Sequence, residues 1–236
     1  GVRVIKDAVY KSFIDKLTSI DFSDASLEQT DLLGAIYEFI IKDFNDEKKS
    51  KAGEHYTPRE LVDLLVQLIE PRNRDLVYDP TSGSGGMLTY AHRYVENHEG
   101  HAADLWLYGQ EMKPVTQALS NLNMVFHGVS NHVIKQGNTL TTPKLKNRNG
   151  GLKKFDKIIA YMPFSVGYED ESLTLRSRFQ YGMPNPLPSK RADFLFVQHM
   201  LSSLKANGII VTVCSTGILF REGKESEIRQ SLIEND

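Results

Sequence analysis

Short apolar runs and segments with helical spacing alternate along most of this chain. The apolar runs are rich in β-branched and aromatic residues, which is typical of buried strands. They fall at residues 76–78, 105–108, 132–135, 157–160 and 209–213. Helical patterns lie around 87–95, from 114 to about 126, from about 193 to 205, and from about 224 onward. This alternation predicts an α/β fold in which a parallel sheet is covered by helices on both faces.

The first fifty residues follow a different pattern. Apolar residues recur there at the spacing of one helix face, at Leu32, Ile36, Phe39 and Ile40. Residues 45–51 (NDEKKSK) are polar and typical of a solvated connector. We therefore expect a helical N-terminal segment over residues 1–50 and an α/β domain over residues 51–236. Residues 231–236 continue an amphipathic helix without a stop signal, so we expect this domain to be incomplete at its C-terminus.

A helix start is expected just after the connector. Thr57 can act as the N-cap, Pro58 as the first helical residue and Glu60 as the third, which makes a capping box for a helix that runs through Ile69. A structural cap explains these three residues. It does not explain the exposed-looking pair His55 and Tyr56 that precedes them, although a lone histidine is more often structural than a ligand.

Composition narrows the class of protein. The chain has 236 residues, 40% of them hydrophobic and 25% charged, and no apolar run approaches the ~18 residues of a membrane span. These values exclude a disordered or membrane-spanning chain. The single cysteine, Cys214, excludes an internal disulfide, and the seven histidines show no metal-ligand spacing, so we expect no metal site. No secretory leader is visible, and a reducing cytoplasm suits the cysteine usage.

The net charge of −2 argues against binding nucleic acid through overall positive charge. A local basic patch remains open as an alternative. Residues 144–154 (KLKNRNGGLKK) carry the densest positive charge. We expect them to form a mobile solvated loop rather than a phosphate contact.

The clearest candidate for a ligand site follows the first predicted strand. Asp79 is followed by Pro80 and then by Thr81, Ser82, Gly83, Ser84, Gly85 and Gly86, directly before a helix. Glycines allow a tight turn and close approach of a ligand, and the helix start offers free N–H donors. The spacing matches neither a phosphate loop with Gly-Lys-Ser/Thr nor the dinucleotide fingerprint. Asp79 suits a ligand with a cationic or hydroxyl-bearing part, and a purely structural turn stays open.

Two further polar residues end neighbouring strands. Glu111 follows the second strand, where a carboxylate can accept hydrogen bonds from both ribose hydroxyls. Its alternative role is a surface carboxylate ahead of a helix. Asn138 follows the third strand, where its amide can read an adenine edge or form an ordinary turn.

In this order and spacing, the motifs resemble the modification subunit of type I restriction-modification systems, an adenine-N6 DNA methyltransferase. The matching stretches are residues 54–59, 79–86, 109–111, 137–140, 192–200 and 217–221. The resemblance implies a Rossmann-like methyltransferase sheet and S-adenosyl-L-methionine as the cofactor. It assigns the cofactor to His55, Tyr56, Thr57, Pro58, Asp79, Thr81, Ser82, Gly83, Ser84, Gly85, Glu111 and Asn138. It also implies a cytoplasmic protein that acts on DNA together with a specificity subunit and a restriction subunit.

The chain departs from this family at the position that carries the chemistry. Where the family has Asn-Pro-Pro-Phe or a close variant, this sequence has Tyr161, Met162, Pro163 and Phe164. The resemblance implies that in the family the asparagine side chain and the carbonyl after it accept hydrogen bonds from the adenine amino group. It also implies that Phe164 of this chain stacks on the flipped base. Losing one such contact typically costs ~10² to 10³ in rate. An impaired cofactor-binding or scaffold subunit is therefore the alternative, and a nicotinamide-dependent oxidoreductase is a weaker third hypothesis.

Overall fold

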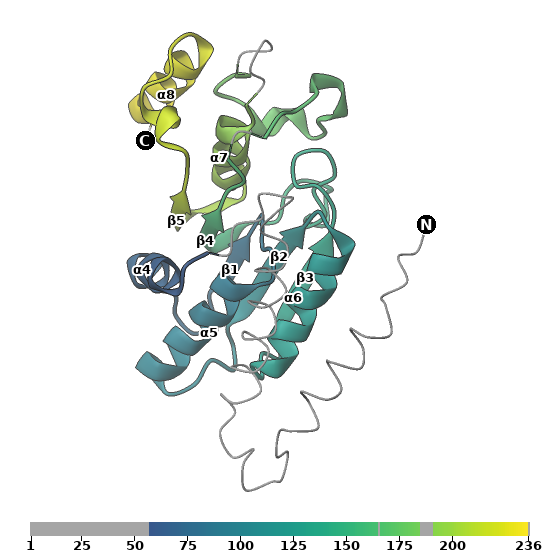
Figure 1. Cartoon of the computed structure of the whole chain (residues 1–236), viewed down its shortest axis with the longest axis vertical. Helices are drawn as coiled ribbons and strands as arrows, with labels where there is room; N and C mark the ends of the chain where they lie inside the picture. The colour runs from purple at the N-terminus through teal and green to yellow at the C-terminus, as the bar shows by residue number, and fades with distance from the viewer. Residues whose placement is uncertain (1–56, 165, 185–190, 236) are drawn as a thin grey trace, which may run out of the picture.

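The computed structural model describes residues 57–164, 166–184 and 191–235. Its centre is a five-stranded, fully parallel sheet with the strand order β3-β2-β1-β4-β5 (Figure 1). The strands are β1 (Leu76–Asp79), β2 (Trp106–Glu111), β3 (His132–Gln136), β4 (Phe155–Tyr161) and β5 (Leu204–Val213). All five were expected from the sequence. The predicted helical segment over residues 1–50 lies outside the described residues.

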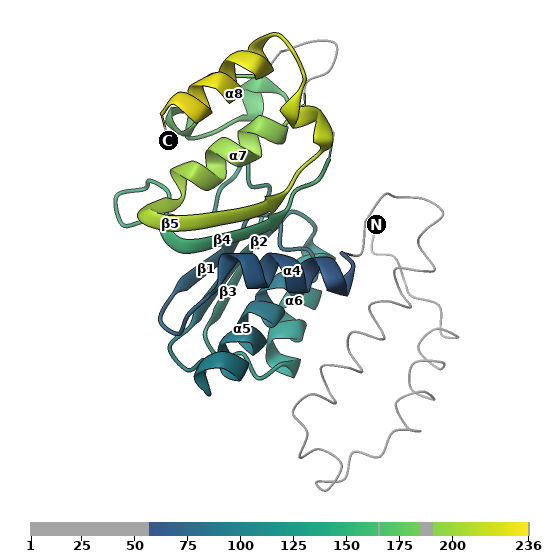
Figure 2. The same ribbon diagram turned by 90° about the vertical axis from the view of Figure 1, so that its left-hand side faces the viewer.

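Helices cover both faces of the sheet, as the alternation predicted. They are α4 (Arg59–Ile69), α5 (Gly86–Glu99), α6 (Pro114–Phe126), α7 (Asp193–Ser202) and α8 (Lys224–Glu234), with short 3₁₀ turns η1 (Asp170–Ser172), η2 (Arg176–Arg178) and η3 (Thr216–Leu219). Figure 2 shows α4, α5 and α6 on one side of the sheet and α7 and α8 on the other. The architecture is therefore a doubly wound α/β domain.

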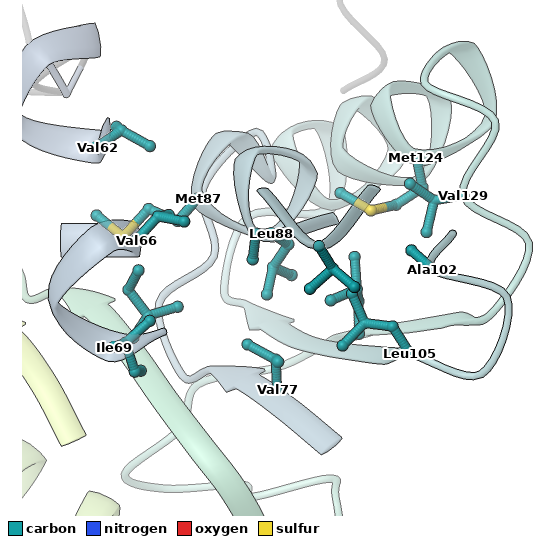
Figure 3. Close-up of a cluster of buried hydrophobic side chains, with 14 of the residues drawn as sticks. Val62, Val66, Ile69, Val77, Met87, Leu88, Ala102, Leu105, Met124 and Val129 are labelled. Atoms are coloured by element: carbon teal, nitrogen blue, oxygen red, sulfur yellow. The ribbon is translucent and has the colours of Figure 1, made fainter. Parts of the chain in front are cut away.

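Two hydrophobic clusters lie on opposite faces of the sheet, because successive residues of a strand point to opposite faces. In β4, Ile159 joins the cluster under α4 and α5, whereas Ile158 and Ala160 join the cluster under α7. The first cluster contains Val62, Val66, Ile69, Val77, Met87, Leu88, Ala102, Leu105, Met124 and Val129 (Figure 3). Burial on both faces explains why the strands read as continuous apolar runs in the sequence.

The start of α4 differs from the predicted capping box. Pro58, not Thr57, is the N-cap, with an extended ψ of 139°, and the helix begins at Arg59. The Pro58 carbonyl accepts hydrogen bonds from Leu61 N and Val62 N at 3.0 Å each. No side chain caps this helix, so the predicted Thr57–Glu60 box was wrong. The predicted end at Ile69 was right.

The boundary between α7 and β5 also differs from the prediction. The helix ends at Ser202, and β5 begins at Leu204 instead of Ile209. Leu204 pairs with Phe155, but the next paired residues are Lys157 and Ile209, so residues 205–208 bulge out of the ladder. Pairing with β4 therefore overrides the helical pattern that the sequence shows up to residue 205.

The connection from β3 to β4, which is fully described, contains no helix. It is formed by residues 137–154, of which Leu140 and Leu145 are buried in the α7-side cluster. Residues 144–154 form a hydrogen-bonded hairpin, with an antiparallel bridge between Lys146 and Leu152. The segment is therefore a hairpin held by backbone pairing and by the buried Leu145, its cations at 144, 146, 148 and 154 are exposed, and the expected mobility stays a prediction.

Candidate cofactor site at the carboxyl edge of the sheet

The candidate site lies where the order of the strands reverses. β1 pairs with β2 on one side and with β4 on the other, so the chain leaves β1 in one direction and later returns to its opposite side. In doubly wound sheets, ligands bind outside the carboxyl ends of the strands at this switch point. Asp79, Glu111 and Tyr161 are the last residues of β1, β2 and β4.

The loop between β1 and α5 is shaped by glycine. Gly83 and Gly85 have φ values of 52° and 86°, in the left-handed region that favours glycine. A Cβ built on Gly85 lies 2.6 Å from Ser120 Oγ and 2.7 Å from Met124 Cε, so α6 leaves no room for a side chain. No atom lies within 4 Å of a Cβ built on Gly83 or Gly86, so the outer side of the loop is open.

A buried carboxylate lies under this loop. Asp79 is 2% exposed, and its Oδ1 accepts a hydrogen bond from Thr81 N at 2.8 Å and lies 3.4 Å from Thr81 Oγ1. Burial raises the pKa of the Asp79 carboxyl to about 7, and the nearby negative charge of Glu111 adds to this rise. The site therefore holds a carboxyl group that gains or loses its proton near neutral pH.

Glu111 joins the end of β2 to the glycine loop. Its Oε2 accepts a hydrogen bond from Gly83 N at 3.1 Å, and its Oε1 accepts one from Lys113 N at 2.8 Å. A carboxylate has about four lone-pair sites, so both oxygens keep acceptor capacity for a ligand. The main chain adds a further link, because Ser82 N donates to the Gln110 carbonyl at 3.1 Å.

The end of β4 is joined to the same loop. Thr81 Oγ1 donates a hydrogen bond to the Tyr161 carbonyl at 3.2 Å, across the switch point. The Tyr161 ring packs at the edge of the α4–α5 cluster, and its centroid lies 5.1 Å from that of Phe164. Met162 is fully buried in the α7-side cluster, and the half-buried Pro163 leads to Phe164. The end of β4 at Tyr161 therefore contacts the loop after β1.

Asn138 forms the turn after β3. Its Oδ1 accepts hydrogen bonds from Leu140 N at 2.8 Å and Thr141 N at 3.2 Å, and its Nδ2 lies 3.6 Å from Met112 Sδ. The side chain therefore shapes the loop, which was the alternative role considered for it. Its Nδ2 can still donate to a ligand.

The start of α4 also belongs to this edge. Lys157 Nζ, near the start of β4, donates to the carbonyl of Ile69 at the end of α4 at 2.8 Å. The helix is therefore antiparallel to the strands, and Thr57 and Pro58, at its start, lie toward the carboxyl edge of the sheet. His55 and Tyr56 lie outside the described residues.

Sequence reasoning missed the polar groups that fix these loops from below. Gln110 is fully buried, and its side chain donates to the carbonyls of Gly137 (3.0 Å) and Thr142 (3.1 Å) and accepts from Lys144 N (2.9 Å). Thr139 Oγ1 donates to the Pro80 carbonyl at 2.5 Å. A polar residue inside an otherwise apolar strand was the signal that could have identified Gln110.

A buried arginine supports the loop after β3 from the α7 side. Arg178 donates to the carbonyls of Thr139 (3.0 Å) and Leu140 and to His199 Nδ1 (2.6 Å). Burial lowers the pKa of His199 well below its usual value, and the neighbouring guanidinium lowers it further, so the ring is neutral. Its Nε2 then donates to the hydroxyl of Tyr78 in β1 at 3.1 Å. Burial also lowers the Arg178 pKa to about 10, at which the guanidinium remains charged near neutral pH.

No group of three or more metal-ligating side chains occurs among the described residues. No helix in the same part of the chain is long and apolar enough to cross a membrane.

Strand order, glycine loop and acidic strand ends define a Rossmann-like α/β domain whose switch point is the candidate ligand site. The family model for N-6 DNA methylase matches residues 28–236. The chain belongs to this family.

Individual relatives agree with this assignment. The chain is 32% identical to the type I restriction enzyme HindI methylase subunit of Haemophilus influenzae, over 87% of this chain and 45% of that protein. It is 33% identical to the MjaVIII methylase subunit of Methanocaldococcus jannaschii, over 97% of this chain and 39% of that protein. A solved methyltransferase subunit of the Streptococcus thermophilus type I restriction-modification system superimposes with a TM-score of 0.77 at 30% identity, over 90% and 45%. The chain thus spans less than half the length of these relatives.

We predict that Gly85→Ala disrupts the loop whereas Gly86→Ala does not. The first substitution places a Cβ at φ 86° against Ser120 and Met124, and the second places one in open space at the helix start. Urea unfolding should show a loss of about 1–3 kcal/mol for Gly85→Ala and a change within about 0.5 kcal/mol for Gly86→Ala. Equal losses would show that the loop is not constrained at Gly85.

Proposed function

We propose that this chain is the catalytic region of a type I modification subunit that transfers methyl from S-adenosyl-L-methionine to adenine N6 in DNA. The observation that carries the proposal is the convergence of the glycine loop, Glu111 and the end of β4 at one switch point, in a chain of the N-6 DNA methylase family. A nicotinamide-dependent enzyme is less favoured, because this loop lacks the spaced dinucleotide glycines.

The residues present fit the cofactor. The open side of Gly83 and Gly86 leaves space next to the N-terminus of α5. We propose that Glu111 accepts hydrogen bonds from the ribose hydroxyls and that Asp79 accepts them from the amino group of the methionine part. Asn138 would donate a hydrogen bond to the adenine. His55, Tyr56, Thr57 and Pro58 would close over it from the start of α4, and Thr81 to Gly85 would line it. The bound cofactor supplies a methyl group on a positively charged sulfur.

The end of β4 would receive the target base. An exocyclic adenine nitrogen is a weak nucleophile, because its lone pair is delocalised into the ring. Acceptors fixed beside the amino group accept hydrogen bonds from it and localise the lone pair on the nitrogen. This favours attack of the nitrogen on the methyl group. We propose that the phenol oxygen of Tyr161 and the carbonyl of Met162 act as these acceptors, and that Phe164 stacks on a flipped adenine.

The remaining partners follow from the relatives, which are named as subunits of type I restriction enzymes. We propose that the chain acts on DNA in the cytoplasm within such an assembly. A specificity subunit would select the sequence, and a restriction subunit would complete the complex. The near-neutral net charge suits a subunit that delegates sequence reading.

Transfer of labelled methyl to adenine in DNA tests the reaction directly. With the specificity subunit present, the chain should transfer methyl, and Tyr161→Asn should be about 10² faster, because an amide oxygen restores a closely held acceptor. Ile233→Leu, at a residue of α8 that is 73% exposed and outside the proposed site, is the control and should leave the rate unchanged. A chain that binds the cofactor but transfers no methyl would exclude the proposed reaction and favour the scaffold role.

Cofactor recognition by Glu111 can be tested by thermal shift. S-adenosyl-L-methionine should raise the melting temperature of the chain, and NAD should not. Glu111→Gln should weaken cofactor binding by about 10- to 100-fold, because it removes charge-assisted hydrogen bonds. Glu222→Gln, at an exposed carboxylate, should have no effect. Stabilisation by NAD alone would favour the oxidoreductase hypothesis.

Cofactor affinity should depend on the protonation of Asp79. Its pKa of about 7 means that the carboxyl is neutral at lower pH and cannot pair with an amino group. Calorimetric titration should show affinity rising by about tenfold per pH unit up to pH 7 and levelling above it. Asp79→Asn should bind weakly at every pH. A wild-type affinity that does not change below pH 7 would contradict this role.

The same pKa has a consequence for stability. Because the folded pKa lies above the ordinary carboxyl value, the ligand-free fold loses stability as the pH rises from about 4 to about 7. Urea unfolding should show this loss in the wild type, and Asp79→Asn should remove it.

A further inference from the structure

The hairpin over residues 144–154 is fixed by its own hydrogen bonds. Lys153 N donates to the Leu145 carbonyl at 3.1 Å, and Asn147 N donates to the Gly151 carbonyl at 2.8 Å. At the tip, Asn147 Oδ1 accepts from Asn149 N at 2.9 Å and from Gly151 N at 3.1 Å. The hairpin therefore presents its side chains in a defined arrangement.

Alternation along the two arms separates the side chains into two faces. Leu145 is buried against the sheet, and Lys153 Nζ lies 4.8 Å from the centre of the Tyr108 ring, which anchors the base of the hairpin. Residues one position away point outward. The outward cations are Lys144, Lys146 and Lys154, with Arg148 at the tip, and all four are exposed.

These outward cations are not neutralised within the part of the chain that the structure describes. Residues 144–154 contain no aspartate or glutamate. None of the four forms an ion pair with a described carboxylate. A protein of net charge −2 thus concentrates positive charge, unpaired among the described residues, on one hairpin. Clustered like charges repel one another, so this surface favours an anionic partner.

The spacing of the charges indicates what kind of anion fits. Alternate residues of an extended strand lie about 6.5 Å apart, so Lys144 and Lys146 follow one arm, and Arg148 continues this row at the tip. Lys154 lies on the other arm, opposite Lys144 in the register set by the bridge between Lys146 and Leu152. A row of separate charges matches a chain of phosphates. The row begins beside the candidate site, because a Cβ built on Gly137 would lie 3.1 Å from Lys144 Cε.

We propose that the outward face of this hairpin binds the phosphate backbone of duplex DNA, away from the target base. This inference rests on the proposed function, which brings the chain to DNA. The contact is electrostatic and independent of sequence, so it holds the subunit on the duplex while sequence reading is done elsewhere.

The test compares two variants that lose the same charge. The hairpin variant carries Lys144→Gln, Lys146→Gln, Arg148→Gln and Lys154→Gln. The control variant carries Arg72→Gln, Arg74→Gln, Arg176→Gln and Lys224→Gln, at exposed cations elsewhere. Fluorescence anisotropy of the full chain with a labelled DNA duplex of mixed sequence gives the affinity over a series of salt concentrations.

The hairpin variant should bind the duplex at least about tenfold more weakly at low salt, and the slope of log affinity against log salt should fall by about 3 to 4. The control variant should keep the slope of the wild type. A third variant with Lys144→Arg, Lys146→Arg and Lys154→Arg should also keep it, because its charge is intact. Circular dichroism and cofactor binding check that each variant is folded.

Equal losses in the hairpin and control variants would overturn the proposal, and so would a full chain that does not bind the duplex. Binding of single-stranded RNA through the hairpin, without duplex binding, would also overturn it. Failure of methyl transfer or of cofactor binding, with hairpin-dependent duplex binding intact, would overturn the proposed function alone.

Discussion

The parallel direction of all five strands is the constraint on which the rest of this structure depends. It brings every strand's carboxyl end to one edge, where the loops after β1, β2, β3 and β4 must satisfy one another's polar groups. The Thr81 hydroxyl donates a hydrogen bond to the carbonyl at the end of β4, and Gly83 N donates one to Glu111. The Thr139 hydroxyl donates one to the Pro80 carbonyl. A ligand at this edge meets a surface that is already cross-linked by hydrogen bonds, so less ordering is needed when it binds.

Buried polar groups maintain this edge from within the core. Arg178 and Gln110 are almost entirely inaccessible to water, and each bonds main-chain carbonyls of the loop after β3. Burying a charged guanidinium is costly unless it is hydrogen-bonded, and both terminal nitrogens of Arg178 donate here, so these bonds favour one position of the loop. His199 must stay neutral to accept from Arg178, which ties its protonation to the position of the loop.

The candidate site combines a regular frame, formed by the paired strands of the sheet, with an unusual last residue of β4, Tyr161. The frame accounts for the position of Tyr161, because pairing with β1 and β5 fixes β4 beside the glycine loop. Frame and chemistry are separable in this fold, since the side chain at that position does not contribute to strand pairing.

The sequence by itself determined the five strands, the parallel sheet and the glycine turn after the first strand, because hydrophobic periodicity and glycine turns are local signals. The family followed from the order of those motifs, and the match to residues 28–236 confirmed it. Tertiary structure decided the start of α4, the early start of β5, the hairpin and the bonds of Arg178 with His199 and Tyr78. These features depend on partners far apart in the chain: Phe155 sets where β5 begins, and Tyr78 lies more than a hundred residues before His199. No local pattern encodes such pairings, because their energy comes from burial and hydrogen bonds that exist only once the sheet has formed.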